Sequence, residues 1–525
     1  MRRIKPALWT LFALAMAVIG CKPPPPTTPA AIASEPNRLY WGDTHVHSSY
    51  SSDAYAMGNH TADPDTAYRW AKGLPVVHPR TQAKVQIEEP LDFMVLTDHA
   101  EDLGRHLDLD PASAWGEIVE AAERNYAPCS FTTFIGWEWT SAPDGKSLHR
   151  IVLMKDAAEQ ANQLEPFSAL HSARPEDLWS WLEETSARVE TDFLAIPHNS
   201  NLSKGAMFAK VDSEGQPITA AYAAARMRWE PLAEVSEGDY ARSGLLRGLA
   251  IGQAVGANPF ELGLLGSTNS HTGLASAEED NFWGAAASES ETGDRPQSGT
   301  EGIRGAELSA QGLTAVWAEE NTRASIFEAF KRKEVYATTG PRIRVRFFGG
   351  WGFNKKQAGD PRMVTLGYTL GWPMGSKLKK APEDKAPGFL MYAVKDPDGA
   401  NLDRIQIVKG WVDADGKTHE RIYDVVWSGK REPGPDGKVP PVTDTVDSAT
   451  AQYLNSAGAP SLRGFWADPD FDSTQRAFYY VRVLQIPTPR HTLYDAVARG
   501  IDPKTLKQPL TIQERAYTSP IWYTP

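Results

Sequence analysis

The sequence predicts an α/β fold followed by an antiparallel β-rich region, and three observations support that class. From residue 39 to 345, apolar strand-like runs alternate with helical patterns, an order that favours parallel pairing of the strands. The runs at 91–96 and 192–196 are almost entirely apolar, as strands buried on both faces are. From 346 to 525, short strands alternate with Asp-Gly turns, which indicates a sandwich-like layer.

The first 38 residues have the pattern of an export signal followed by a tether. Basic residues precede an apolar run that is too short to span a bilayer. Residues 18–21, Val-Ile-Gly-Cys, resemble a bacterial lipobox, in which the cysteine is lipidated; a plain cleaved signal is the alternative. We expect a signal peptide at 1–20, lipidation of Cys21 and a proline-rich tether at 21–38.

This N-terminus predicts a location in the cell envelope, in the periplasm or at the outer membrane, with the lipid as the contact to the membrane. The chain has 54 Lys and Arg against 66 Asp and Glu, a net charge of −12. Such an acidic chain is not expected to coat nucleic acid, although a local metal centre can still attract an anionic substrate.

Helical patterns in the first region cover 112–124, 175–188 and 322–333. Between 272 and 312 the sequence becomes polar and rich in small residues. Because this stretch directly follows His271, we expect a long surface loop that acts as a lid, with a disordered insertion of no functional consequence as the alternative.

The second region contains short strand patterns whose function the sequence leaves open. They would cover the first region, or bind a glycan or a protein partner. The expected strands are 343–348, 388–394, 405–408, 420–426 and 477–484.

Residues that can bind metal recur in short packets, and most packets follow strand-like runs. In a strand, the i, i+2 spacing aims both side chains at the same side, and runs 91–96 and 192–196 each deliver a histidine just past their ends. In α/β barrels that end of the strands carries the active site. The packets hold six of the twelve histidines and comprise His45, His47, Asp53, Thr97-Asp98-His99, Glu138, His149, His198, Asn269 and His271.

A mixture of imidazole and carboxylate ligands favours zinc, manganese or iron, whereas calcium prefers oxygens and structural zinc prefers cysteines. Glu138 is expected to bridge two metals through its two carboxylate oxygens. A hydroxide shared by the metals would be the attacking group, so no side chain is expected to act as the nucleophile. The other six histidines are expected to be structural, with His106 as the nearest exception.

These packets resemble the four motifs of the polymerase-and-histidinol-phosphatase (PHP) superfamily. Further phrases resemble one uncharacterised bacterial branch of it, domain of unknown function 3604, and the resemblance covers nearly all of the mature chain. The phrases lie at 40–45, 90–93, 336–342, 402–411 and 519–523.

The resemblance implies a distorted seven-stranded β/α barrel with two or three divalent transition metals at its mouth. By position, one metal would take His45, His47, Glu138 and Asn269. A second would take Glu138, His149 and His198, and a third would take Asp53, His99 and His271. The superfamily usually has an aspartate at the position of Asn269, and the neutral amide would weaken that site or make it more electrophilic.

Four further residues are predicted around this ligand set. Asp98 would either orient His99 or cap the following turn. Asn199, Lys204 and Arg342 are expected to contact the substrate.

The predicted function is a metal-dependent hydrolase, a phosphoesterase acting on a small-molecule phosphomonoester or phosphodiester outside the cytoplasm. One alternative is the same site hydrolysing another ester, an amide or a sulfate. A second alternative is a non-catalytic cell-surface binding lipoprotein whose metals are structural.

Overall fold

The computed structural model describes residues 38–235, 240–290, 299–300 and 303–525. The predicted signal peptide, the lipidation residue Cys21 and the tether up to residue 37 lie outside the described residues. No helix within the described ranges combines the length and the apolarity needed to cross a bilayer.

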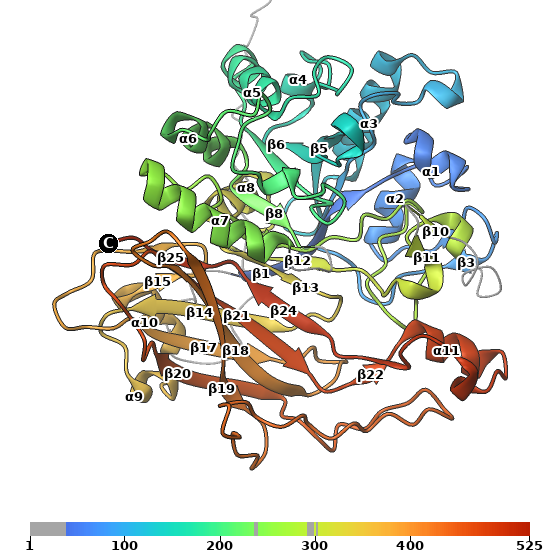
Figure 1. Cartoon of the computed structure of the whole chain (residues 1–525). Coiled ribbons are helices and arrows are strands. Elements are labelled where there is room, and N and C mark those ends of the chain that lie inside the picture. Colours follow the sequence, from blue (N-terminus) through green and yellow to red (C-terminus); the bar gives the residue numbers. More distant parts are fainter. Residues whose placement is uncertain (1–37, 236–239, 291–298, 301–302) are drawn as a thin grey trace, which may run out of the picture.

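A mixed sheet of thirteen strands runs through the protein (Figure 1). At its centre, β1 (Arg38–Val46) is parallel to β4 (Phe93–Leu96), and β4 is parallel to β5 (Thr132–Trp139). On its other side, β1 pairs antiparallel with β12 (Leu313–Ala318). These strands are buried, in keeping with their apolar sequences, and the predicted α/β class is confirmed.

The next two strands of the sheet are antiparallel. β6 (Arg150–Met154) runs against β5, and β7 (Phe193–Pro197) runs against β6, so the predicted parallel pairing of the 192–196 run is wrong. The short segment between β5 and β6 has no crossover helix, which a parallel pair needs, so β6 is reversed. The reversed β6 is the strand with which β7 pairs, and this pair is therefore antiparallel. Because β5 and β7 both oppose β6, their C-terminal ends still lie at the same edge.

Two short strands, β8 (Leu232–Glu234) and β9 (Gly263–Leu265), form a separate parallel pair. The large sheet follows an open path that ends at β7, and the strand pairs of the described residues do not close it. The predicted seven-stranded barrel therefore stays a prediction.

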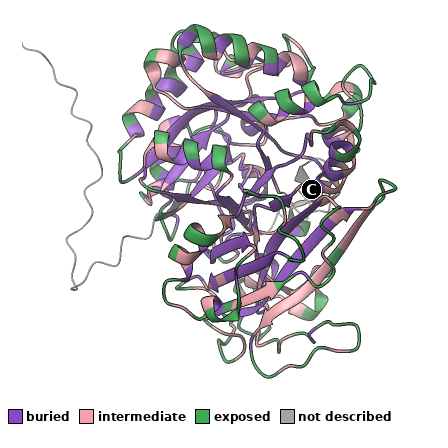
Figure 2. Cartoon of the chain, turned by 90° about the vertical axis from the view of Figure 1, so that its left-hand side faces the viewer, coloured by how far each residue is buried: buried purple, intermediate pink, exposed green. Residues whose placement is uncertain are grey.

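The three predicted helices are present as α3 (Pro111–Asn125), α5 (Pro175–Val189) and α8 (Arg323–Arg332). Asp110 caps α3 by accepting a hydrogen bond from the Ser113 amide, and Thr322 caps α8 in the same way. The apolar faces of the helices lie on the sheet and their polar faces are exposed (Figure 2).

The other helices were not predicted from the sequence. They are α1 (Ser52–Ala56), α2 (Pro64–Ala71), α4 (Ala158–Ala161), α6 (Ala220–Trp229), α7 (Tyr240–Val255), α9 (Lys355–Ala358), α10 (Met363–Leu370) and α11 (His491–Ala498). Single 3-10 turns cover Arg105–Leu107, Pro143–Gly145, Ala206–Phe208, Ala287–Glu289, Gly305–Glu307 and Pro503–Thr505.

The C-terminal region is β-rich, as predicted, and occupies the lower half of Figure 1. A four-stranded antiparallel sheet packs against strands of the large sheet, with the Phe389 and Tyr479 rings 4.6 Å apart. The small sheet holds β15 (Trp372–Pro373), β14 (Arg344–Gly350), β17 (Gly388–Val394) and β20 (Ser461–Ala467). The C-terminal strands of the large sheet are β16 (Lys377–Leu378), β18 (Leu402–Val412), β19 (Thr418–Trp427), β21 (Ala477–Gln485), β24 (Arg515–Thr518) and β25 (Ile521–Tyr523).

The two predicted regions share the large sheet. β13 (Val335–Thr338), from the first region, pairs with β24 near the C-terminus. The predicted boundary at residue 345 is thus crossed by backbone hydrogen bonds, and the division into domains stays a prediction. Two-stranded ladders complete the fold: β2 (Val76–Val77) with β3 (Lys84–Val85), β10 (Gly299–Thr300) with β11 (Ile303–Arg304), and β22 (Thr488–Pro489) with β23 (Thr511–Ile512).

The described start of the predicted 272–312 loop is mostly buried, so a solvent-exposed loop is the wrong description of 272–290. The Trp70 indole donates to the Ala275 carbonyl (2.8 Å), and the Ser288 amide donates to the Met57 carbonyl (2.9 Å). This segment therefore packs against α2 and the end of α1. The predicted lid role stays untested, and 291–298 lie outside the described residues.

Close strand packing predicts the effect of one glycine substitution. A Cβ on Gly136 in β5 would lie 2.7 Å from the Val95 side chain and 2.8 Å from the Val152 carbonyl. We expect Gly136→Ala to lower the free energy of unfolding by about 1–3 kcal/mol in chemical denaturation. The matched control is Gly116→Ala in α3, where nothing lies within 4 Å. That change should stabilise the protein by about 0.5–1 kcal/mol, and equal effects of the two variants would contradict the packing.

Candidate metal centre

The predicted ligand residues converge on one buried cluster. Eight of the nine belong to groups whose candidate donor atoms lie within 4.8 Å of one another. The groups are His47, Asp53, His99 and His271; His45, His47 and Glu138; Glu138, His149 and His198; and His45, His198 and Glu234.

Strand direction explains this convergence. His45 lies near the end of β1, His99 follows β4, and His198 follows β7, all at the C-terminal edge of strands that run the same way. His149 directly precedes β6, which runs in the opposite direction, so it reaches the same edge. Residues 269–271 follow β9, and Ser270 forms a parallel bridge with Val46.

Glu138 lies at the centre of the cluster and is only 1% exposed. Its Oε2 is 3.2 Å from His45 Nε2 and 3.3 Å from His47 Nε2. Its Oε1 is 2.9 Å from His149 Nδ1 and 3.1 Å from His198 Nε2. Each carboxylate oxygen therefore faces a different pair of imidazoles, the arrangement that a bridging carboxylate requires.

Asp53 organises the other side of the cluster. Its Oδ2 is 2.8 Å from His99 Nε2 and 2.9 Å from His271 Nε2. The His47 ring stacks on the His271 ring, with centroids 4.2 Å apart, and belongs to this group as well as to that of Glu138. His47 thus connects the two sides.

Four rings direct Nε2 at Glu138 or Asp53, while another oxygen contacts Nδ1. The Ser51 hydroxyl contacts His47 Nδ1 (2.9 Å), and the Thr140 hydroxyl contacts His99 Nδ1. The Asn269 carbonyl contacts His271 Nδ1 (3.0 Å), and Glu234 Oε2 contacts His45 Nδ1 (3.0 Å). An Nδ1–H held in this way leaves the Nε2 lone pair free for a metal.

The sequence analysis missed these outer partners, above all Glu234. It ends the three-residue strand β8, a run too short to be recognised beside Pro231. The sequence signal that could have identified Glu234 is a carboxylate at the end of an apolar run, as at Glu138. The hydroxyls of Ser51 and Thr140 carry no pattern of their own.

The residues present fit divalent cations. Asn269 Oδ1 and His198 Nδ1 are buried and have no hydrogen-bond partner within the described residues. A buried acceptor without a partner is costly, and a cation would satisfy the Asn269 amide oxygen. The imidazole-rich, cysteine-free donor set is that of a transition-metal site.

Without metal, protons would hold the cluster together. Burial alone would raise the pKa of Glu138, but the surrounding imidazoles, His99 and His198 foremost, hold it well below its usual range. Burial disfavours charge on His45 and His99, yet neighbouring carboxylates outweigh it and raise their pKa values to about 9 and about 10. Metal binding would therefore displace protons.

Of the remaining predicted residues, Asn199 and Lys204 lie in the loop after His198. Asn199 follows His198 directly, and the exposed Lys204 reaches the loop that precedes His149, with its ammonium beside Gly145. Their contact with substrate stays a prediction.

Asp98 and Arg342 have other partners. Asp98 accepts hydrogen bonds from the Ser48 amide and hydroxyl, both at 2.7 Å, which fixes the loop after β1. Arg342 donates to the carbonyls of Glu89 (2.7 Å) and Pro90 (2.8 Å), just before β4. Its guanidinium lies at the end of β4 opposite to His99, so its partners give it a structural role instead of the predicted substrate contact.

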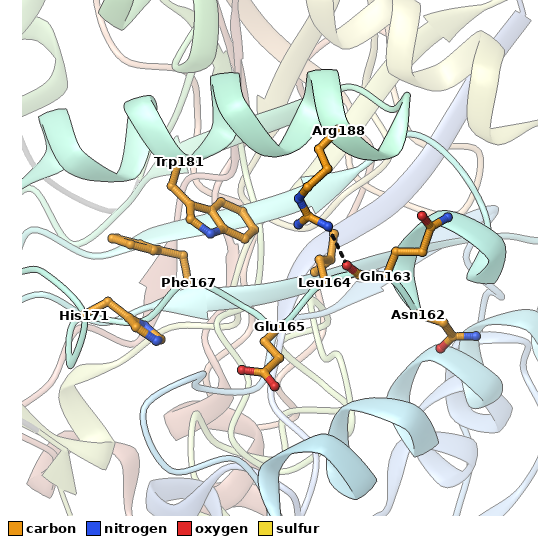
Figure 3. Close-up of a pocket in the computed structure, with 8 residues that line it drawn as sticks. All are labelled: Asn162, Gln163, Leu164, Glu165, Phe167, His171, Trp181 and Arg188. Carbon is orange, nitrogen blue, oxygen red and sulfur yellow. Dashed lines mark hydrogen bonds between the residues drawn. The ribbon is translucent and has the colours of Figure 1, made fainter.

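A surface hollow of about 530 Å³ lies between the 162–171 segment and α5 (Figure 3). Trp181, Phe167 and His171 form one side of it, and Arg188, Gln163 and Asn162 the other. None of its lining residues belongs to the metal-binding groups. The candidate centre is therefore separate from this hollow.

A family model described as protein of unknown function (DUF3604) matches residues 34–113, 108–238 and 233–525. The chain belongs to this family. The predicted resemblance to this family is thereby confirmed over residues 34–525. No match was found among curated proteins.

Two solved structures resemble this member of the family. One, from Bacteroides vulgatus ATCC 8482, is a two-domain protein containing a predicted PHP-like metal-dependent phosphoesterase. It is 12% identical with a TM-score of 0.33, over 84% of this chain and 90% of that one. The other, assigned as a metal-dependent phosphoesterase from Bifidobacterium adolescentis ATCC 15703, is 15% identical with a TM-score of 0.19, over 44% of this chain and 88% of that one. Structural similarity at these TM-scores does not extend to the residues of the site.

The raised pKa values predict how the metal-free protein responds to pH. Protonated His45 and His99 stabilise the folded state below about pH 6.5, the unfolded pKa of histidine. That contribution should be lost as the pH rises through about 9 and about 10. We expect the thermal midpoint in chelator to fall between pH 6.5 and 10. His99→Asn should show a smaller fall, and a midpoint that rises over this interval would contradict the ion pairs.

Proposed function

We propose that the protein is a metal-dependent hydrolase that cleaves phosphomonoesters or phosphodiesters. The observation that carries this proposal is Glu138, a buried carboxylate whose two oxygens face separate imidazole pairs. Such a carboxylate suits a pair of neighbouring cations, which is a common arrangement in phosphoester hydrolysis.

Within this proposal, His45, His47, Glu138 and Asn269 hold one cation, and Glu138, His149 and His198 hold a second. Asp53, His99 and His271, with His47 nearby, provide a third position. Manganese, zinc and iron suit this donor set. Bound cations of this kind activate water near neutral pH and neutralise charge on the leaving oxygen.

The charge of the site favours an anionic substrate. The carboxylates of the metal-binding groups are Asp53, Glu138 and Glu234, and two or three divalent cations would outweigh their negative charge. Lys204, exposed in the loop after His198, adds a flexible positive charge at the edge. We assign Lys204 and Asn199 to binding the phosphate or its substituent.

We also propose that seven strands around the cluster form a distorted barrel. They would follow the order β1, β4, β5, β6, β7, β8 and β9. The parallel bridge between Val46 and Ser270, and the contact of β8 with β7, support closure through β8 and β9. The antiparallel β6 would be the source of the distortion.

The activity is tested with the mature chain carrying Cys21→Ser. With manganese or zinc, we expect it to release nitrophenol from nitrophenyl phosphate or bis-nitrophenyl phosphate. The variant His45→Ala/His47→Ala should lose activity by at least about 100-fold, because both rings contact Glu138 and would hold the proposed cation.

Arg342→Gln is the matched control, since its guanidinium binds the segment before β4. Arg342→Gln should keep most of the activity when rates are expressed per amount of folded protein. Equal rates for wild type and the double-alanine variant would rule out the proposal. Parallel assays with sulfate ester, carboxylate ester and amide substrates would identify hydrolysis of a different bond. Metal that raises the thermal midpoint without hydrolysis of any of these substrates would indicate a binding protein whose metals are structural.

We propose further that the protein is exported and anchored through lipid on Cys21. The lipobox-like residues 18–21 and the proline-rich segment before the fold support this. Mass spectrometry of protein extracted from membranes should give a mature N-terminus at Cys21 that carries acyl chains. An unmodified N-terminus elsewhere would contradict it.

A further inference from the structure

We infer that Glu234 is a positioning residue that fixes the ring of His45 and strengthens it as a metal ligand. This inference rests on the proposed metal site, but it concerns a residue that contacts the ligand from outside. Glu234 is the last residue of β8 and is 6% exposed. Its Oε2 lies 3.0 Å from His45 Nδ1, and the His45 ring is fully buried.

His45 is held between carboxylates on both ring nitrogens. Nδ1 faces Glu234, while Nε2 lies 3.2 Å from Glu138 Oε2 and 3.1 Å from His47 Nε2. A buried hydrogen bond to a carboxylate is short and strong, so it fixes both the ring plane and the tautomer. The Nε2 atom is thereby directed at the space between Glu138 and His47.

Charge distinguishes Glu234 from the other outer partners. Ser51 and Thr140 offer hydroxyls to His47 and His99, and Asn269 offers its backbone carbonyl to His271. Among these four rings, only His45 has a carboxylate within hydrogen-bond distance of Nδ1, since Glu138 Oε1 lies 3.7 Å from His99 Nδ1. A carboxylate hydrogen-bonded to Nδ1 makes the imidazole a stronger metal ligand than a hydroxyl at the same position does.

The ligand set around His45 explains why such a charge matters. His45, His47 and Asn269 are neutral ligands, so Glu138 is the only carboxylate among the four residues assigned to that cation. Its charge is shared with the group of His149 and His198. Glu234 adds a second negative charge one ring away without occupying a coordination position.

The backbone supports this arrangement. Glu234 pairs with Leu265 in the parallel ladder of β8 and β9, and the Val235 amide donates to the Leu265 carbonyl (2.8 Å). The carboxylate is thus fixed by the same pair of strands that leads to Asn269 and His271. The alternative is that Glu234 binds a cation directly with His45 and His198, since their donor atoms also lie within 4.8 Å of one another.

A double-mutant cycle tests the inference. Binding of Co²⁺ and Zn²⁺ is measured by chelator competition for four mature chains: wild type, Glu234→Gln, His45→Ala, and both changes together. Gln keeps the size of the side chain and one oxygen acceptor but removes the charge. We expect Glu234→Gln to weaken the tightest affected site by about 10–100-fold and to alter the visible Co²⁺ spectrum.

In the His45→Ala background, Glu234→Gln should cause no further loss, because the residue acts through that ring. The same loss in both backgrounds would overturn the inference and indicate direct coordination or a general effect on folding. Thr140→Val, which removes the neutral partner of His99, is the matched control and should weaken binding by less than 10-fold. Thermal midpoints in chelator report folding of every variant.

These readouts need no substrate. Coupling of Glu234 to His45 without phosphoester hydrolysis would support this inference and refute the proposed function. Phosphoester hydrolysis by the wild type, together with equal losses of metal affinity from Glu234→Gln in both backgrounds, would support the proposed function and refute this inference. Absence of divalent cation binding by the wild type would overturn both.

Discussion

The organisation of the centre depends on one buried carboxylate. Four imidazoles, those of His45, His47, His149 and His198, lie within 3.3 Å of Glu138, and each oxygen faces two of them. The His99 ring lies slightly farther away, with Nδ1 3.7 Å from Oε1. Taking a carboxylate out of water is costly unless opposite charge or hydrogen bonds compensate it. Protons on the histidines or metal ions must supply that compensation, so folding, protonation and metal binding are coupled at this residue.

Strand direction is the second constraint, because it decides which side chains can meet. The parallel strands β1, β4 and β5 end at the same edge, and the reversal at β6 brings His149 to that edge from the start of its strand. A parallel β6 would place His149 at the other end of the sheet. The antiparallel insertion is therefore part of the construction of the site.

The C-terminal region extends the sheet that carries the candidate centre. Its strands continue the large sheet through the β13–β24 pair, and aromatic contacts such as Phe389 with Tyr479 join the two sheets. Arg342, in the connection between β13 and β14, binds the segment before β4. This links the C-terminal layer to a strand that carries His99 at its far end.

Local patterns in the sequence predicted the α/β class, three helices, five of the C-terminal strands and the candidate metal ligands, because period-two spacing and apolar runs are local properties. The antiparallel pairing of β6 and β7, the burial of 272–290 and the backbone partners of Arg342 emerged from the three-dimensional fold, because they depend on residues far away in the chain. The role of Glu234 likewise depends on a distant residue. It lies 189 residues from His45, and no local pattern connects a three-residue strand to that ring.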